Sequence, residues 1–395
     1  MNSKKSTLFI LSLVGLFGCG PDAKHNENPG YGKLKNTLKV SFDSSKAYAL
    51  DSSTAVSDGT ITHSYYLKGK YYMTLFNPQN GNLYFYDDRD QTYQFKIPLL
   101  KEIRIKNSVL KMKDYLVKSM DSIFIFNYDG PVVYLINEKG KLIDHFQIGH
   151  ELGQGKHGYE LSSPFANPSV TSPMVISATN ELLMTGWLAG ETKSDSAFNR
   201  LILNSYDLKG RKVAYEMDYT KDYGTANWGG TLFRIPYSTY NPNTGEFVTS
   251  LPAKHQVIIR RPDRTLSEKM ASSNAVKEIS SMDDKEKKYV KYDSNAHFST
   301  TPSYWAIIYD NYRNVYYRVL QLPDESQKLD RYGWRSKKNI IIVLDHEFNY
   351  LGESDVPENL SFETFFISPE GLSLLDKKNK NDDLAVFRTM TYEKN

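Results

Sequence analysis

Three long loops in the chain carry side chains that are suited to holding a ligand. They cover residues 149–170, 219–231 and 291–305, and they combine glycines with aromatic, imidazole and amide groups. Aromatic faces stack on ring-bearing ligands, while imidazoles and amides form directional hydrogen bonds. The predicted ligand-binding residues are therefore His157, Asn167, Asn227, Trp228, His297, Tyr304 and Trp305. The competing interpretation is that the tryptophans pack between structural units and that the loops only cap them.

Sequence signatures of cofactor and nucleophile sites are absent or incomplete. The stretch GQGKHG at residues 153–158 has the glycine spacing of a dinucleotide loop, but the YELSSPFANP that follows has no helical period. A dinucleotide loop needs a helix there, because the helix N-terminus binds the phosphates. No G-x-S-x-G motif of a serine hydrolase occurs, and the eight histidines are scattered. We predict no cofactor and no metal, although distant segments can still converge on one ion in a folded chain.

Paired carboxylates would be the signature of a glycosidase. Such enzymes place two carboxyl groups about 5 to 10 Å apart across the bound sugar. Asp218, Asp222 and Glu363 are candidates, but no spacing singles out a pair. A binding or scaffolding role, with a glycan, a peptide or a protein as ligand, is therefore favoured. The alternative is an enzyme that acts on glycans or cell-envelope material with carboxylates from several parts of the chain.

The single cysteine of the chain, at position 19, follows a signal-like N-terminus. Two lysines precede the apolar run at residues 8–17, which has the length of a signal-peptide core and is too short to span a bilayer. Gly18 is a small residue directly before Cys19, as in a bacterial lipoprotein cleavage site, although Phe17 is larger than usual there. Residues 1–18 are therefore predicted to be a lipoprotein signal peptide, and Cys19 the site of lipid attachment. The alternative is an ordinary signal followed by a buried cysteine.

The segment after the cysteine is predicted to be a flexible tether over residues 19–35. It lacks an apolar period and is rich in Gly, Pro, Asn and charged residues. Loss of the signal peptide lowers the formal net charge from +3 to +1, which gives no reason to expect nucleic acid as a partner. Gly20, in place of an aspartate after the cysteine, favours the outer membrane. The predicted location is the outer membrane, on its periplasmic side or at the cell surface, with the membrane as partner through the lipid.

Short apolar strands and tight turns repeat through the rest of the chain. The clearest copy, at residues 121–146, has three apolar runs separated by Asp129-Gly130 and Lys139-Gly140. Glycine and asparagine accept the positive φ that hairpin turns need. Five further copies occupy residues 81–97, 180–217, 243–270, 314–354 and 362–395.

Several of the predicted strands are apolar on both faces. Residues 123–126 read Ile-Phe-Ile-Phe, and residues 340–343 read Ile-Ile-Ile-Val. Such strands must be covered on both sides, and the blades of a propeller cover one another around a central axis. Residues 36–395 are therefore predicted to form an all-β, six-bladed β-propeller. The last copy is one strand short, and the N-terminal strand at 36–45 is predicted to close the last blade. A pair of β-sandwich domains is the alternative.

Only residues 272–292 have a helical pattern. Val276, Ile279 and Met282 lie three positions apart after two serines that can cap a helix. The many charged residues of this segment favour a solvent-exposed segment at the surface without a function of its own.

The sequences WAIIYDNYRNVYYRV at residues 305–319 and FFISPEGLSLL at 365–375 complete a set of features that resembles a known family. Together with the lipoprotein-like cleavage site at Gly18-Cys19 and the six strand-and-turn repeats, these sequences make the chain similar to the six-bladed β-propeller lipoproteins of Bacteroidetes. This uncharacterised family is related in architecture to TolB-like and NHL-like propellers. The resemblance covers nearly the whole mature chain. It implies the propeller and the lipid anchor, and because its motifs are architectural it implies no catalytic residue.

Overall fold

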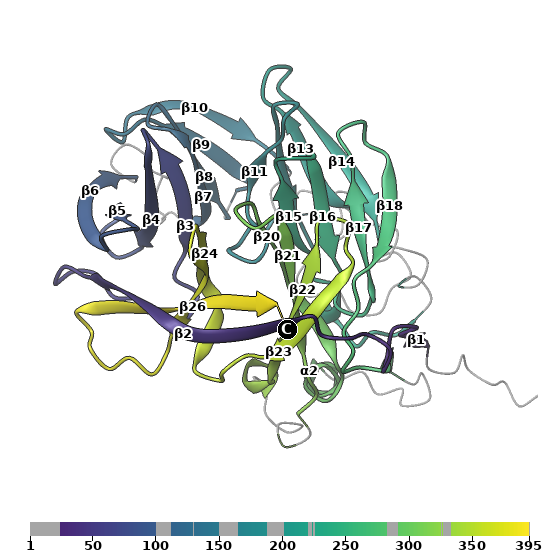
Figure 1. Cartoon of the computed structure of the whole chain (residues 1–395). Helices are drawn as coiled ribbons and strands as arrows, with labels where there is room; N and C mark the ends of the chain where they lie inside the picture. Colours follow the sequence, from purple (N-terminus) through teal and green to yellow (C-terminus); the bar gives the residue numbers. More distant parts are fainter. Residues whose placement is uncertain are drawn as a thin grey trace, which may run out of the picture.

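Six four-stranded antiparallel sheets form a ring in the described part of the chain (Figure 1). The structure is a computed structural model, and it describes residues 24–99, 112–128, 130–149, 165–187, 201–219, 223, 226–282, 291–324, 326 and 333–394. The arrangement confirms the predicted all-β, six-bladed β-propeller and excludes two β-sandwich domains. Among the described residues, no helix has the length and apolar character needed to cross a membrane.

In blades 1 to 5 the strands pair in the order in which they occur in the chain. Blade 1 contains β3 (Thr62–Leu67), β4 (Lys70–Asn77), β5 (Asn82–Asp87) and β6 (Thr92–Pro98). Blade 2 contains β7 (Met112–Ser119), β8 (Ser122–Asn127), β9 (Val132–Ile136) and β10 (Leu142–Gln147). Blade 3 contains β11 (Val175–Ile176), β12 (Glu181–Thr185), β13 (Leu201–Asp207) and β14 (Lys212–Asp218). Blade 4 contains β15 (Tyr237–Asn241), β16 (Glu246–Ser250), β17 (Gln256–Arg260) and β18 (Leu266–Met270), and blade 5 contains β20 (Ser303–Asp310), β21 (Val315–Gln321), β22 (Asn339–Asp345) and β23 (Tyr350–Asp355).

Blade 6 joins the two ends of the chain. It contains β24 (Leu360–Ser368), β25 (Gly371–Asp376), β26 (Leu384–Lys394) and, as its outer strand, β2 (Leu38–Ala49). β2 pairs antiparallel with β26 from Leu38 opposite Lys394 to Ala49 opposite Leu384. The predicted closure by an N-terminal strand is confirmed, and the strand runs four residues further than expected. At the β24–β25 turn Gly371 has φ 154°, where any Cβ would collide with the Met390 carbonyl oxygen.

The core lies between blades rather than at the centre of the ring. Ile123 and Ile125 of β8 pack in a cluster with blade 1, whereas Phe124 and Phe126 of the same strand pack with blade 3. Likewise Ile340 and Ile342 face blade 4, and Ile341 and Val343 face blade 6. Successive strand residues point to opposite faces of a sheet, so a strand between two neighbouring blades is apolar at every position.

The expectation of a flexible tether at residues 19–35 is wrong for the part that the structure describes. β1 (His25–Glu27) pairs antiparallel with β19 (Glu278–Ser280). Asn28 is buried, and its Nδ2 donates to the carbonyl oxygens of Ser273 at 2.6 Å and Val276 at 2.7 Å. The partners of this short segment lie about 250 positions away in the chain, so no local pattern could reveal them.

The helix expected at residues 272–292 is not formed by the described residues 272–282. Residues 278–280 form β19, and α2 (Lys291–Thr300) begins only where the expected helix ends. Val276 and Ile279 are buried in the cluster that joins blades 3, 4 and 5. The short η2 (Thr231–Arg234) and η4 (Gly333–Ser336) lie against α2.

Candidate functional site

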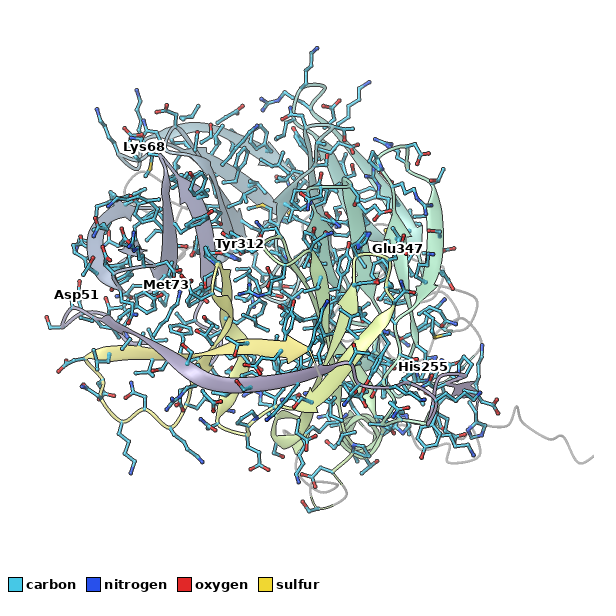
Figure 2. The ribbon with its side chains drawn as sticks, viewed as in Figure 1. Asp51, Lys68, Met73, His255, Tyr312 and Glu347 are labelled. Carbon is cyan, nitrogen blue, oxygen red and sulfur yellow. The ribbon has the colours of Figure 1, made fainter. Side chains whose placement is uncertain are left out.

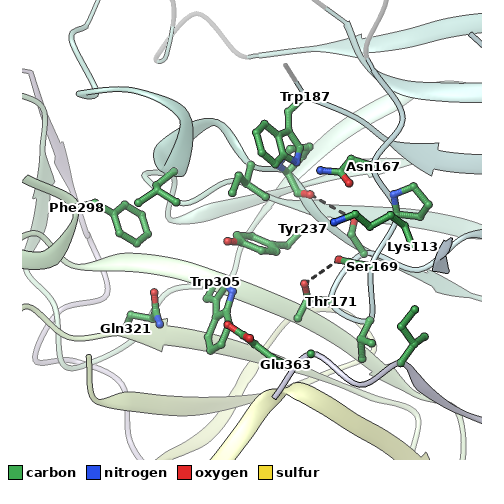
Figure 3. A pocket seen from close by; sticks show the side chains of 18 of the residues that line it. Lys113, Asn167, Ser169, Thr171, Trp187, Tyr237, Phe298, Trp305, Gln321 and Glu363 are labelled. Carbon is green, nitrogen blue, oxygen red and sulfur yellow. Dashed lines mark hydrogen bonds between the residues drawn. The ribbon is translucent and has the colours of Figure 1, made fainter. Parts of the chain in front are cut away.

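A cavity of about 430 Å³ opens at one end of the ring, where the innermost strands of the blades begin (Figure 3). All six blades contribute to its lining, because each inner strand starts at this end of the axis. We call this cavity the funnel. Its described lining consists of Gly59, Ile61, Met112, Lys113, the segment 167–172, Trp187, Leu232, Ile235, Pro236, Tyr237, Phe298, Trp305, Gln321 and Glu363.

Four aromatic side chains form much of the wall. Trp187 follows β12, Tyr237 begins β15, Phe298 belongs to α2 and Trp305 belongs to β20. Trp187 and Trp305 are half-buried, so each presents part of its ring to the cavity. Flat aromatic surfaces from different blades give a ligand several stacking faces inside one enclosed space.

The inner segment of blade 3 carries the polar side of the funnel. Ser169 and Ser172 exchange backbone hydrogen bonds of 3.1 and 3.0 Å, and the Asn167 N–H donates to the Thr185 carbonyl oxygen at 3.0 Å. These bonds fix the segment while the Asn167 side chain remains half-buried at the funnel wall (Figure 3). Gln321, the last residue of β21, supplies a second amide from blade 5.

Two charged side chains stand in the described lining, and they have opposite signs. Lys113 of β7 is exposed, and its Nζ lies 5.1 Å from the centre of the Tyr128 ring. Glu363 of β24 is half-buried, and burial, reinforced by Asp58, raises the pKa of its carboxyl above the usual range. Figure 3 shows Glu363 next to Trp305 and Lys113 next to Asn167, on different sides of the cavity.

Two of the seven predicted ligand-binding residues, Asn167 and Trp305, line the funnel. His157 lies outside the described residues. Asn227 lies in the loop before η2, where its Oδ1 accepts a hydrogen bond from the Gly229 N–H at 3.1 Å and its carbonyl oxygen accepts one from Met282. Asn227 therefore holds its own loop and does not belong to the funnel lining.

Trp228, His297 and Tyr304 are packing residues, which corrects their assignment to the ligand site. Trp228 is 1% exposed, with its ring 5.4 Å from that of Tyr223 and 5.7 Å from that of Phe233. Tyr304 is 0% exposed, and its hydroxyl contacts His255 Nδ1 at 2.8 Å. His297 of α2 is half-buried, its ring lies 5.4 Å from that of Phe233, and burial lowers its pKa to about 4. Of the three predicted loops, the described residues 167–170, Phe298 and Trp305 line the funnel, and no described residue of 219–231 does.

Sequence reasoning missed Trp187, Tyr237, Lys113 and Gln321. Each occurs at the funnel end of a strand, which is the only signal that could have selected it.

Of the carboxylates considered for a glycosidase, Glu363 alone lies in the described lining, while Asp218 is exposed at the end of the outer strand β14 and Asp222 lies outside the described residues. Within the described part of the chain, no three His, Cys, Asp or Glu side chains gather as ligands for a metal ion.

The fold and the cavity together define a closed six-bladed β-propeller with an axial funnel. The chain belongs to the family described as Domain of unknown function (DUF4221), whose model matches residues 34–355. This membership confirms the resemblance to the propeller family of Bacteroidetes.

Solved structures support the same fold. A crystal structure of a DUF4221 member from Bacteroides vulgatus has a TM-score of 0.72 at 18% identity, over 92% of this chain and 100% of that chain. A putative exported protein from Bacteroides fragilis has a TM-score of 0.52 at 10% identity, over 91% of this chain and 96% of that chain. No curated protein matches the chain.

Proposed function

We propose that the chain is a lipid-anchored binding protein of the bacterial envelope, and that its ligand occupies the funnel. The observation that carries this proposal is the lining itself. Four aromatic side chains and two amides, drawn from different blades, converge on one cavity. Such a combination offers apolar contact and orientation to a glycan or a peptide.

A binding role is favoured over glycosidase catalysis because the described lining of the funnel lacks a pair of carboxylates. A glycosidase needs a second carboxyl group about 5 to 10 Å from the first. The described lining of the funnel contains one carboxylate, Glu363, and its other polar groups are amides, hydroxyls and one lysine. These groups can orient a bound molecule and hold it.

The anchor is the second part of the proposal. Cys19 lies outside the described residues, and its lipidation rests on the signal-like residues 8–17 and on Gly18 before it. A lipid on Cys19 would hold the propeller at the outer membrane, on the periplasmic side or at the cell surface. The first described residue, Lys24, is already attached to the propeller, because its backbone N–H donates to Ser281 Oγ at 2.8 Å. Only residues 20–23 would then separate the lipid-bearing cysteine from the first residue that is attached to the propeller.

A glycan and peptide array tests the binding role. The chain from Lys24 onward is applied to the array, and the strongest hits are titrated by calorimetry. Trp187→Ala and Trp305→Ala should each weaken binding by about 1 to 3 kcal/mol, since each removes a stacking face. Tyr66→Ala is the matched control, because Tyr66 is an exposed aromatic residue near the far end of β3. Equal affinities for the two funnel variants, the control and the unmodified chain would place the ligand elsewhere.

A further inference from the structure

An unsatisfied acceptor lies in the part of the funnel wall that blade 5 supplies. Gln321 is 2% exposed, and its Nε2 donates to Asn339 Oδ1 over a long 3.4 Å. Its Oε1 is buried and accepts no hydrogen bond from any described residue. Buried acceptors are nearly always paired in folded proteins, so an unpaired one in a cavity wall is available to a donor group of a ligand.

A carboxylate stands unpaired on the same wall. The backbone N–H of Glu363 donates to Ser361 Oγ at 3.0 Å, but its carboxylate forms no ion pair or hydrogen bond with a described residue. Asp58, Arg335 and Lys377 influence its charge only from a longer distance. Burial of a carboxylate without a cation is costly, and a cationic ligand group would remove that cost.

The Trp305 side chain lies beside these two acceptors in the wall of the funnel. Figure 3 shows Gln321, Trp305 and Glu363 in a row along one wall of the funnel, with Phe298 and Tyr237 above them. A carboxylate, an amide oxygen and an aromatic face are the three groups that together bind an ammonium ion, through ion pairing, hydrogen bonding and cation–π attraction. A neutral hydroxyl group has a single donor and no charge, so it would form only one of these three interactions.

We infer that this wall binds a protonated primary amine of the ligand, an inference that rests on the proposed binding role of the funnel. The ammonium group has three N–H donors, of which one reaches the Glu363 carboxylate and another the Gln321 Oε1. Lys113 and Asn167, on the other side of the cavity, offer donors to a carbonyl or carboxylate group of the same molecule. The amine belongs either to the N-terminus of a short peptide or to an amino sugar.

Matched probes with and without a free amine test the inference. Trialanine is compared with N-acetyl-trialanine, and glucosamine with N-acetylglucosamine, by calorimetric titration of the full chain. At least one free amine should bind ten times or more tightly than its acetylated partner, and the pair that shows the preference identifies the source of the amine. Equal binding of both members of each pair, or no saturable binding of either free amine, overturns the inference.

Two substitutions assign the preference to the wall. Glu363→Gln should reduce the preference for the free amine about tenfold or more, and Gln321→Glu, which adds an acceptor charge, should increase it. Glu347→Gln is the control, because Glu347 is an exposed carboxylate in the β22–β23 turn (Figure 2). Unchanged preference in Glu363→Gln, with an unchanged melting temperature, contradicts the inference. If array ligands lacking an amine still lose affinity in Trp305→Ala, the binding role stands and only the amine assignment fails.

Discussion

Lys46 of β2 and the buried carboxylate of Asp88 form an ion pair between blade 6 and blade 1. The Lys46 Nζ lies 2.7 Å from Asp88 Oδ2, and the two side chains are 7% and 3% exposed. Lys46 Nζ also donates to Ser368 Oγ at 3.1 Å, and the Tyr48 hydroxyl donates to Asp88 Oδ1 at 2.7 Å. The strand that closes the ring is thus attached to both blades that it joins.

Removal of this pair should destabilise the whole propeller. Lys46→Met leaves the Asp88 carboxylate buried without its cation, and we expect the free energy of unfolding to fall by about 3 to 5 kcal/mol. Urea denaturation provides the measurement. The double variant Lys46→Met with Asp88→Asn should recover part of the loss, because no buried carboxylate then lacks its cation. Glu370, whose Oε2 also lies 2.9 Å from Lys46 Nζ, is 52% exposed and stays hydrated. Additive losses in the double variant would show that the two side chains do not interact.

The docked N-terminal segment should contribute to stability, in contrast to a flexible tether. Asn28→Ala removes the donor to the Ser273 and Val276 carbonyl oxygens, and we expect a loss of about 1 to 3 kcal/mol. Lys35→Ala, an exposed neighbour, is the control and should have no measurable effect. Thermal melts that coincide for both variants and the unmodified chain would argue that residues 24–28 do not dock in solution.

Trp228→Ala should impair folding and leave ligand affinity intact. The indole is enclosed between Tyr223 and Phe233, so its removal creates a cavity that costs about 3 to 5 kcal/mol. Trp305→Ala should cost less stability, because Trp305 is half-buried at the funnel wall. Denaturation gives the stability, and calorimetry on the folded fraction gives the affinity. A reversed result, with Trp228→Ala stable but unable to bind, would return Trp228 to the ligand site.

Acid should weaken the contact between the N-terminal segment and blade 4 through His255. Burial, together with the nearby Arg318, lowers the pKa of His255 to about 4. The unfolded chain therefore binds a proton between the ordinary histidine value of about 6.5 and pH 4, while the folded chain does not, and stability falls as the pH drops through this range. His255 alone accounts for at most about 3 kcal/mol of this loss.

The pH dependence of urea denaturation measures this effect. His255→Gln, which retains hydrogen-bonding groups toward Tyr304 and Asn26, should have a flatter slope between pH 6.5 and 4. His346→Gln, at an exposed position, should retain the slope of the unmodified chain. Identical slopes in all three proteins would show that His255 is accessible to protons when folded.

Lipid attachment is tested at Cys19. Cells that produce the full chain should incorporate labelled palmitate into it, and Cys19→Ala should abolish the label, because no other thiol is present in the sequence. Ser6→Ala, within the predicted signal peptide, is a control that leaves the thiol in place. Label that persists in Cys19→Ala would exclude this residue as the anchor.

The sequence by itself determined the propeller. Ile123 to Phe126 are apolar at every position, and a strand can carry such a pattern only where both faces of its sheet are covered. The missing strand of the last copy and the alternating segment near residue 40 likewise predicted the closure of blade 6. These features follow from local composition and from the two-residue period of a strand.

Only the tertiary structure decided which side chains reach the funnel. Tyr304 and Trp305 are neighbours in β20, with similar chemistry, yet Tyr304 is buried toward blade 4 and Trp305 lines the cavity. Adjacent strand residues point to opposite faces, and which face meets the axis depends on the register and twist of the blade in the ring. The docking of Asn28 on residues 273 and 276 also depends on the tertiary structure, because a contact across about 245 positions leaves no trace in the local sequence.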